Sequence, residues 1–238
     1  MRFIALLLLA TAGHTTIRAQ QIGTTKPSAL EFIGRQLDRG VPSKSATAVV
    51  GTPFTIAQWA PGRVLTTNGS VGPVWLKYNL ASNQLLWRRA AGDSLELNTS
   101  QVNEFALGDS LKGSRTTYRR YLTARIEDLN LRTAFFEVCY DGGRSALLRQ
   151  RTKQFTAGGG GSPSLTEGRP AAWQEVSQYF VKRADNIVLP VRLKEKAVLE
   201  ALGSDHALEL MAYTKREHLS LGKQADVAKL LRYYDTLP

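Results

Sequence analysis

Two copies of the tetrapeptide Gly-Asp-Ser-Leu, at residues 92–95 and 108–111, are the motif that most suggests enzymatic chemistry. A serine attacks an ester only when a general base takes its proton and an oxyanion hole receives the developing charge. Gly-Asp-Ser is also a favourable turn sequence, because Gly adopts positive φ and Asp or Ser bonds the backbone two residues on. Two nucleophiles so close together make no catalytic sense. We therefore predict turns at both copies and no catalytic residue.

The tetrapeptide resembles the nucleophile block of the GDSL esterases and lipases, in which a serine after a hydrophobic strand attacks an ester with the help of a His. The family's later Asp-x-x-His block is absent, because Gly203 and Lys215 stand three residues before His206 and His218. Its Gly-x-Asn-Asp block is absent too, and consecutive strand patterns replace its alternation of strands and helices. A GDSL-like esterase is therefore a remote alternative, and we expect no enzyme.

Ser94, Ser110 and Thr236 are candidate sites of O-glycosylation. Each follows an Asp and precedes a Leu, and this Asp-Ser/Thr-aliphatic pattern resembles the O-glycosylation signal of exported Bacteroidota proteins. Asn68 and Asn98 match the N-glycosylation acceptor pattern, which applies only in a eukaryotic secretory route. The three O-linked sites remain predictions that an intact mass would test.

Residues 118–125 combine basic and aromatic side chains in a strand-like pattern. On one continuous strand, Arg119, Tyr121 and Arg125 would share a face, so that two cations flank an aromatic ring able to stack on a sugar or base. These three are our candidate ligand-binding residues. The alternative is a solvent-facing sheet on which Arg stems cover the Tyr.

Metal and thiol chemistry have little support in the sequence. The one cysteine, Cys139, lies in an aromatic and β-branched stretch, where a free Cys is more often a small core residue than a nucleophile. A single cysteine cannot form a disulfide within the chain. His206 and His218 are twelve residues apart, with no accompanying Cys or carboxylate pattern typical of zinc sites. We expect no metal and no cofactor.

The first nineteen residues have the pattern of a signal peptide. A positive Met1-Arg2 start precedes an apolar stretch over 3–12, and small residues lead to a cleavage position after Ala19. The alternatives are a buried helix or a membrane anchor, but about ten apolar residues are half of the roughly 20 needed to span a bilayer. We expect export to the periplasm or the extracellular space, and no transmembrane segment in the mature chain.

Basic residues outnumber acidic ones by 31 to 20, for a net charge of +11. Cleavage after Ala19 would remove Arg2 and Arg18 and leave +9. Inside a cell this excess would suggest nucleic acid, but an exported chain more plausibly meets an anionic glycan, lipopolysaccharide or another envelope protein. We therefore expect no nucleic acid partner. The alternative is a solvated surface charge that aids solubility.

Periodicity places elements that would position these residues. Residues 26–40 have helical spacing, whereas from about 47 to 155 apolar residues recur with period 2 between turn residues. Asn68-Gly69 indicates a hairpin, with Val74, Leu76, Tyr78 and Leu80 on one face of the second strand and Trp75, Lys77 and Asn79 on the other. A second hairpin occupies 173–193, where Pro190 suggests an edge. Helical period returns from 194 onward.

The resulting fold class is mainly β (α+β): an antiparallel sheet, sandwich or partly closed barrel, with a short N-terminal helix and short C-terminal helices. We expect a signal peptide over 1–19, an N-terminal segment with a short helix over 20–46, an antiparallel β domain over 47–193 with a flexible Gly/Ser/Pro loop over 156–171, and a helical element over 194–238 packed on the sheet. A phosphate-binding loop is the alternative at 156–171, but the Lys-Ser/Thr that should follow it is missing.

Gly51-Thr52-Pro53-Phe54, Pro61-Gly62-Arg63-Val64 and the final helical stretch over 227–234 resemble exported proteins of Bacteroidota that have no assigned function. The matching motifs are structural, so the resemblance implies location and fold rather than activity. We expect a non-enzymatic envelope or interaction role. The alternative is a periplasmic carrier that holds a lipid-like ligand in a β-barrel cavity.

Overall fold

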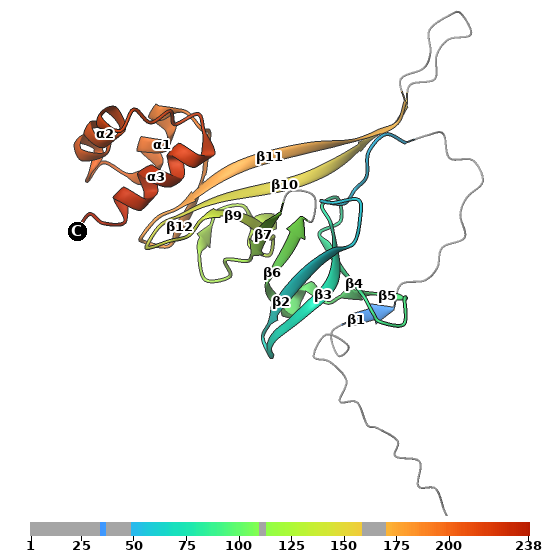
Figure 1. Cartoon of the computed structure of the whole chain (residues 1–238). Coiled ribbons are helices and arrows are strands. Elements are labelled where there is room, and N and C mark those ends of the chain that lie inside the picture. The colour runs from blue at the N-terminus through green and yellow to red at the C-terminus, as the bar shows by residue number, and fades with distance from the viewer. Residues whose placement is uncertain (1–33, 37–48, 110–112, 159–169) are drawn as a thin grey trace, which may run out of the picture.

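The computed structural model describes residues 34–36, 49–109, 113–158 and 170–238 (Figure 1). Their strands form one sheet of twelve, in the order β1-β5-β4-β3-β2-β6-β7-β9-β10-β11-β12-β8. The sheet is open, with β1 and β8 at its two edges, and all pairings are antiparallel except that of β12 with β8. The prediction of a mainly antiparallel β fold with short C-terminal helices is therefore confirmed.

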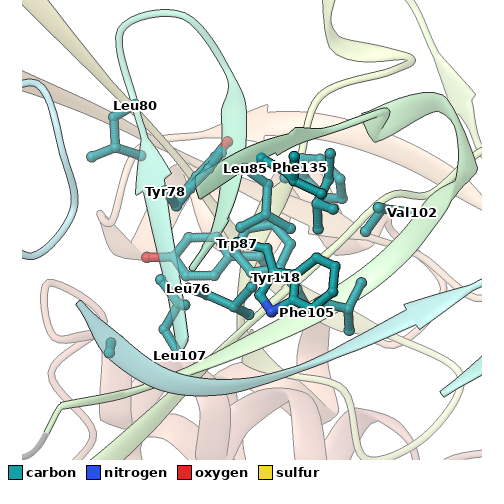
Figure 2. Close-up of a cluster of buried hydrophobic side chains, with 14 residues drawn as sticks. Leu76, Tyr78, Leu80, Leu85, Trp87, Val102, Phe105, Leu107, Tyr118 and Phe135 are labelled. Atoms are coloured by element: carbon teal, nitrogen blue, oxygen red, sulfur yellow. The ribbon is translucent and has the colours of Figure 1, made fainter. Parts of the chain in front are cut away.

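The first half of the chain, called the meander below, is an antiparallel sheet that curls around an aromatic core (Figure 2). Its strands are β1 (Gly34–Gln36), β2 (Ala60–Thr66), β3 (Gly69–Asn79), β4 (Gln84–Arg88), β5 (Ser94–Leu97), β6 (Val102–Asp109) and β7 (Ser114–Arg119), with a 3-10 turn at Thr99–Gln101. Strands β2 to β5 pair in sequence order, and β6 returns to the other edge of β2. The alternation predicted along β3 is confirmed, because Leu76 and Tyr78 are buried while Trp75 is exposed. The predicted hairpin is also present: Gly69, at φ +124°, opens β3 opposite Thr66.

The second half is built on one long hairpin. Its strands are β8 (Arg125–Ile126), β9 (Phe136–Tyr140), β10 (Ala146–Thr156), β11 (Ala172–Lys182) and β12 (Ile187–Val191), with a 3-10 turn at Leu129–Leu131. Strands β10 and β11 pair along their full length. Beyond β12 come α1 (Glu195–Leu202), α2 (Ala207–Arg216) and α3 (Gln224–Tyr234). Gly203, at φ +95°, ends α1.

Both faces of this second half are covered near the helices, whereas residues 174–178 of β11 are exposed. The three helices bury one face, where Leu147 and Val181 meet Leu210 and Leu230. On the other face, Phe136, Phe180 and their neighbours are covered by the segment over 121–134. The sheet is thus sandwiched here, whereas the meander buries only its inner face. No helix in the described part of the chain is long and apolar enough to span a membrane.

Two local predictions were wrong. A helix was expected over 26–40, but Gly34–Gln36 form β1. These residues pair with β5, whose outer edge offers backbone hydrogen-bond donors and acceptors to an added strand. The rest of that range, residues 1–19 and most of the 156–171 loop lie outside the described residues. One continuous strand was considered over 118–125, but β7 ends at Arg119, and a turn closes where the Ala124 N–H donates to the Tyr121 carbonyl.

Candidate functional site

The three predicted binding residues do not form a shared face, because the strand that should carry them is broken after Arg119. Arg119 is held by ion pairs with Glu104 and Asp141, the first at 2.5 Å. Tyr121 turns inward against Phe136, with ring centroids 6.2 Å apart, and burial is the main cause that raises the pKa of its hydroxyl. Arg125 lies in β8 beside β12. Arg119 does lie over the Tyr121 ring, 6.0 Å from its centroid, but Arg125 does not join them, so the predicted face with two cations flanking an aromatic ring is wrong.

The Gly-Asp-Ser-Leu copies differ in structure. In the first copy Gly92, at φ +91°, and Asp93 lie in the predicted turn, whereas Ser94 and Leu95 begin β5. In the second copy Gly108 and Asp109 are the last residues of β6 rather than a turn, and Ser110 lies outside the described residues. The strand persists there because Asp109 pairs with Ser114 in β7.

Both described histidines lie far from Ser94, the first residue of β5. His206 precedes α2 and contacts Glu209 and Tyr234, and His218 follows the same helix. Figure 1 places this helical element and β5 at opposite ends of the molecule. The geometry offers Ser94 no general base from either histidine. Thr236, the third candidate glycosylation site, follows α3, and its hydroxyl donates to the Tyr233 carbonyl at 2.6 Å.

A groove between β3 and β4 brings together an exposed tryptophan and two arginines. Its volume is about 550 Å³, and its lining includes Pro73, Trp75, Trp87, Arg88 and Arg89. Trp75 is 52% exposed, so its ring is available to a ligand. Trp87, only 8% exposed, anchors the groove in the core.

Strand register explains why these residues meet. Trp75 pairs with Arg88 across β3 and β4, and Arg88 pairs with Ser94 across β4 and β5. The period-2 alternation of each strand points the next residues, Leu76, Trp87 and Leu95, into the core. Trp75, Arg88 and Ser94 therefore form an outward row, and each is next in sequence to a side chain buried in the core.

The two arginines of the groove are held differently. Arg89 forms an ion pair with Asp93 across the turn between β4 and β5, which fixes its position. Arg88 is exposed, and within the described part of the chain it has no acidic partner. Its charge is therefore available to an incoming anion.

The same outer face carries further positive charge. The Lys77 ammonium, two residues along β3 from Trp75, lies 4.4 Å from the Phe54 ring centroid and 5.7 Å from that of Trp59. Partial burial lowers its pKa. Arg63 and Arg115 are exposed on β2 and β7, and neither has an acidic partner among the described residues. An anion that approaches this face meets cations in several rows.

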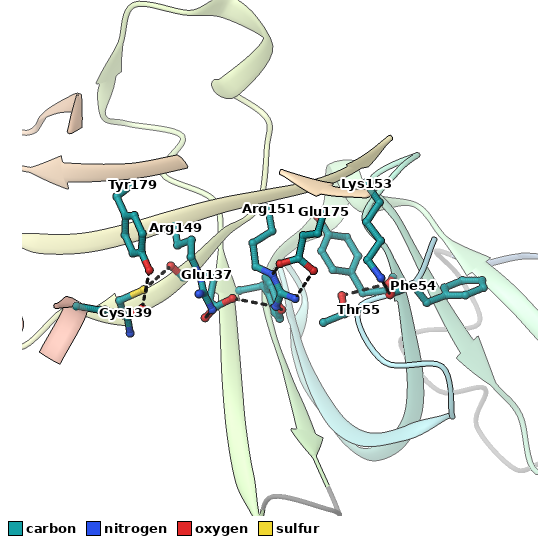
Figure 3. A network of polar contacts seen from close by, with 12 residues as sticks. Phe54, Thr55, Glu137, Cys139, Arg149, Arg151, Lys153, Glu175 and Tyr179 are labelled. Atoms are coloured by element: carbon teal, nitrogen blue, oxygen red, sulfur yellow. Dashed lines mark hydrogen bonds and ion pairs between the residues drawn. The ribbon is translucent and has the colours of Figure 1, made fainter. Parts of the chain in front are cut away.

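A second charged cluster has a different character (Figure 3). Glu137, 7% exposed, accepts from Arg149 and Arg151, and Arg151 also makes two hydrogen bonds of 2.8 Å to Glu175. Lys153 donates to the carbonyls of Thr52 and Phe54. These charges are matched to one another and tie the hairpin to the meander, so this cluster is structural.

Cys139 adjoins that cluster and is a poor nucleophile. Its thiol is half-buried, and burial, with Glu137 as the second cause, raises its pKa to about 12. The thiolate is the reactive form, so this environment suppresses its reactivity near neutral pH. Within the described residues no group of three metal-ligating side chains occurs.

The interior of the meander is filled with side chains. Phe105 stacks on Tyr118 at 4.9 Å (Figure 2). Tyr78 meets both of these rings edge-on or tilted, and Phe135 meets Phe105 edge-on. A lipid carrier needs a cavity to hold its ligand. The carrier alternative stays a prediction, and any ligand cavity would have to lie away from these rings.

Comparison of the chain with protein-family models, curated proteins and solved structures gave no match. The choice of this groove as the candidate site therefore rests on its geometry alone. Sequence reasoning placed Trp75 on the outward face of its strand but did not single it out, and it missed Arg88 altogether. The available signal was a tryptophan at an outward position of an alternating strand.

Proposed function

We propose that the chain is a non-enzymatic binding protein of the cell envelope that holds an anionic glycan in the groove between Trp75 and Arg88. The observation that carries this proposal is the exposed Trp75 ring beside an Arg88 that has no acidic partner in the described structure. An aromatic face stacks on the apolar face of a sugar ring, and a guanidinium pairs with a carboxylate, sulfate or phosphate.

The composition of the groove favours binding over catalysis. Ser94, in the row of Trp75 and Arg88, has neither described histidine near it, and no metal-ligand group stands among the described residues. The pattern of residues 1–19 supports export, where anionic glycans and the phosphorylated sugars of lipopolysaccharide are abundant. The charge of the chain favours the same class of ligand.

The test is isothermal titration of the purified protein with a heparin tetrasaccharide, with maltotetraose as the uncharged control. Trp75→Ala removes the stacking surface and Arg88→Glu reverses the charge, so each should weaken heparin binding at least about tenfold. Arg125→Glu makes the same charge change on β8, outside the groove, and should bind like the wild type. Equal loss of heparin affinity in all three variants would mean that binding depends on net charge and not on this groove. Equal affinity for heparin and maltotetraose would contradict the proposal.

The non-enzymatic part has its own test. A serine-directed fluorophosphonate probe should leave Ser94 and Ser110 unlabelled in the native protein, because the geometry offers Ser94 no base and the chain lacks the esterase blocks that would serve Ser110. Stoichiometric labelling of either serine would contradict this part of the proposal while leaving the glycan titration to be judged separately.

A further inference from the structure

The outer edge of β11 has a gap between two occupied positions. At one end Val50 bridges Ala172: the Val50 N–H donates to Ala171 and the Trp173 N–H donates to Val50. At the other end Val191 of β12 pairs with Tyr179. Strand β11 continues past the end of β12, as Figure 1 shows. The five residues over 174–178 are exposed, and within the described structure nothing pairs with their outer side.

The backbone groups in this gap are identifiable from strand geometry. The N–H and C=O of one residue point to the same side of a strand, and successive residues alternate. Because Trp173 and Tyr179 bond outward, Glu175 and Ser177 also point their N–H and C=O groups away from β10. Neither residue has a hydrogen-bond partner for these groups within the described part of the chain. Native sheets usually block such edges with Pro, Lys or a bulge, and this stretch has none of them.

A groove opens at the same place. It has a volume of about 850 Å³ and runs between the residues 176–179 of β11 and the residues 190–193, with Gly222 at its far side. An unpaired strand edge that forms the wall of a groove is the arrangement that accepts an added strand from a partner.

The charge of the rim selects the partner. Arg192 lines the groove, and Lys194 and Lys223 directly follow its lining residues Leu193 and Gly222. All three cations are exposed. Arg192 and Lys194 form no ion pair in the described structure, whereas Lys223 lies near Asp226 and helps to lower the pKa of that carboxyl. The acid of the edge itself, Glu175, is neutralised by Arg151, which is the main cause that lowers its pKa.

The size of the gap limits the occupant. Six residue steps separate Trp173 from Tyr179, so the open edge is about 20 Å long and fits an extended segment of about five residues. A second copy of β11 has eleven residues and would collide with Val50 and Val191 at the two ends. We infer that the edge of β11 between Val50 and Val191 binds a short, extended, acidic segment of a partner protein by strand addition.

The experiment measures binding of a fluorescent Glu-Val-Glu-Val-Glu peptide to the full chain by anisotropy, with Lys-Val-Lys-Val-Lys as the charge control. A third peptide has the acidic sequence with N-methyl groups on alternate amides, which removes its strand-pairing donors and keeps its charge. The acidic peptide should bind at least about tenfold more tightly than either control, because it alone makes both backbone hydrogen bonds and complementary charge contacts.

Ser177→Pro removes one outward N–H without removing a bond to β10, and it should weaken the acidic peptide at least about tenfold. Ser177→Thr keeps the backbone donor and should bind like the wild type. Should Ser177→Pro fail to fold, two measurements still test the inference. Arg192→Glu should bind the acidic peptide more weakly than the wild type, and the N-methylated peptide should bind the wild type more weakly than the acidic peptide does.

Three results would overturn the inference. These are equal binding of the N-methylated peptide, preference for the basic peptide, or no binding of the acidic one. A wild-type dimer in sedimentation equilibrium that Ser177→Pro dissociates would instead give the edge to a second copy of this chain.

Discussion

The groove on β3 and β4 and the ion-pair cluster around Glu137 on β9–β11 use charge in opposite ways. In the sandwiched half, Arg149 and Arg151 lie against Glu137, and the helices and a loop cover both faces. In the meander, one face packs on the core and the other is open, where Arg88 has no acidic partner in the described structure. Matched charges stabilise the fold, and unmatched charges beside Trp75 are available for a ligand.

The largest expected effect comes from opening the core that holds the groove in place. Phe105, 1% exposed, contacts the rings of Tyr78, Tyr118 and Phe135. Phe105→Ala should lower the free energy of unfolding by about 3–5 kcal/mol, because it removes a buried ring and leaves a cavity. Urea unfolding measures this loss. Phe155→Ala, at a ring 51% exposed, is the control and should cost far less.

That prediction also tests how separate the two halves are. If Phe105→Ala leaves the protein folded, heparin affinity should fall because Trp75 loses its support from the meander core. Leu230→Ala, in the core under the helices, should lower stability but leave heparin affinity unchanged in the folded protein. Equal loss of affinity in both variants would contradict the assignment of binding to the meander alone.

A smaller effect is expected from the matched charges. Glu137→Gln leaves Arg149 and Arg151 without their shared acid in a buried position, and it should cost about 2 kcal/mol in urea unfolding. Heparin binding should be unaffected. Arg88→Glu should show the opposite pattern, with little change in stability and a large loss of binding. A destabilising Arg88→Glu would mean that its charge is structural after all.

The smallest effect concerns alkaline pH. Burial, with the charge of Glu137 second, raises the pKa of Tyr118 to about 12 from an ordinary value of 10.0. The unfolded chain then releases the proton first, so the stabilising contribution is complete below pH 10 and is lost as pH rises from 10 toward 12. Tyr118→Phe should make unfolding less sensitive to pH in this range. Urea unfolding between pH 9 and 11 measures this. If the free energy of unfolding of Tyr118→Phe fell with pH as steeply as that of the wild type, the prediction would be contradicted.

Local sequence signals were sufficient for much of the meander. Asn68-Gly69 predicts its hairpin because Gly adopts positive φ, and the alternation from Val74 to Leu80 predicts which face of β3 is buried. The turn at Gly92 follows from the same turn chemistry. These features depend on residues close together in the chain.

The features that were missed depend on tertiary pairing. Residues 118–125 alternate like a strand, but Tyr121 packs against Phe136 instead of continuing β7. Ile126 pairs with β12, which is distant in sequence. Gly34–Gln36 form a strand because the edge of β5 is available. The groove needs the register that sets Trp75 opposite Arg88, and no pattern within either strand specifies it.

The most direct test is the tryptophan fluorescence of the folded protein during titration with the heparin tetrasaccharide. The wild type should show a saturable change in emission, because a sugar that stacks on Trp75 excludes water from its exposed ring. Trp75→Phe should keep part of the affinity and lose most of the change, because Trp87 is only 8% exposed and the other two tryptophans, Trp59 and Trp173, lie outside the groove lining. An identical change in Trp75→Phe and the wild type would contradict the assignment of the glycan to this groove.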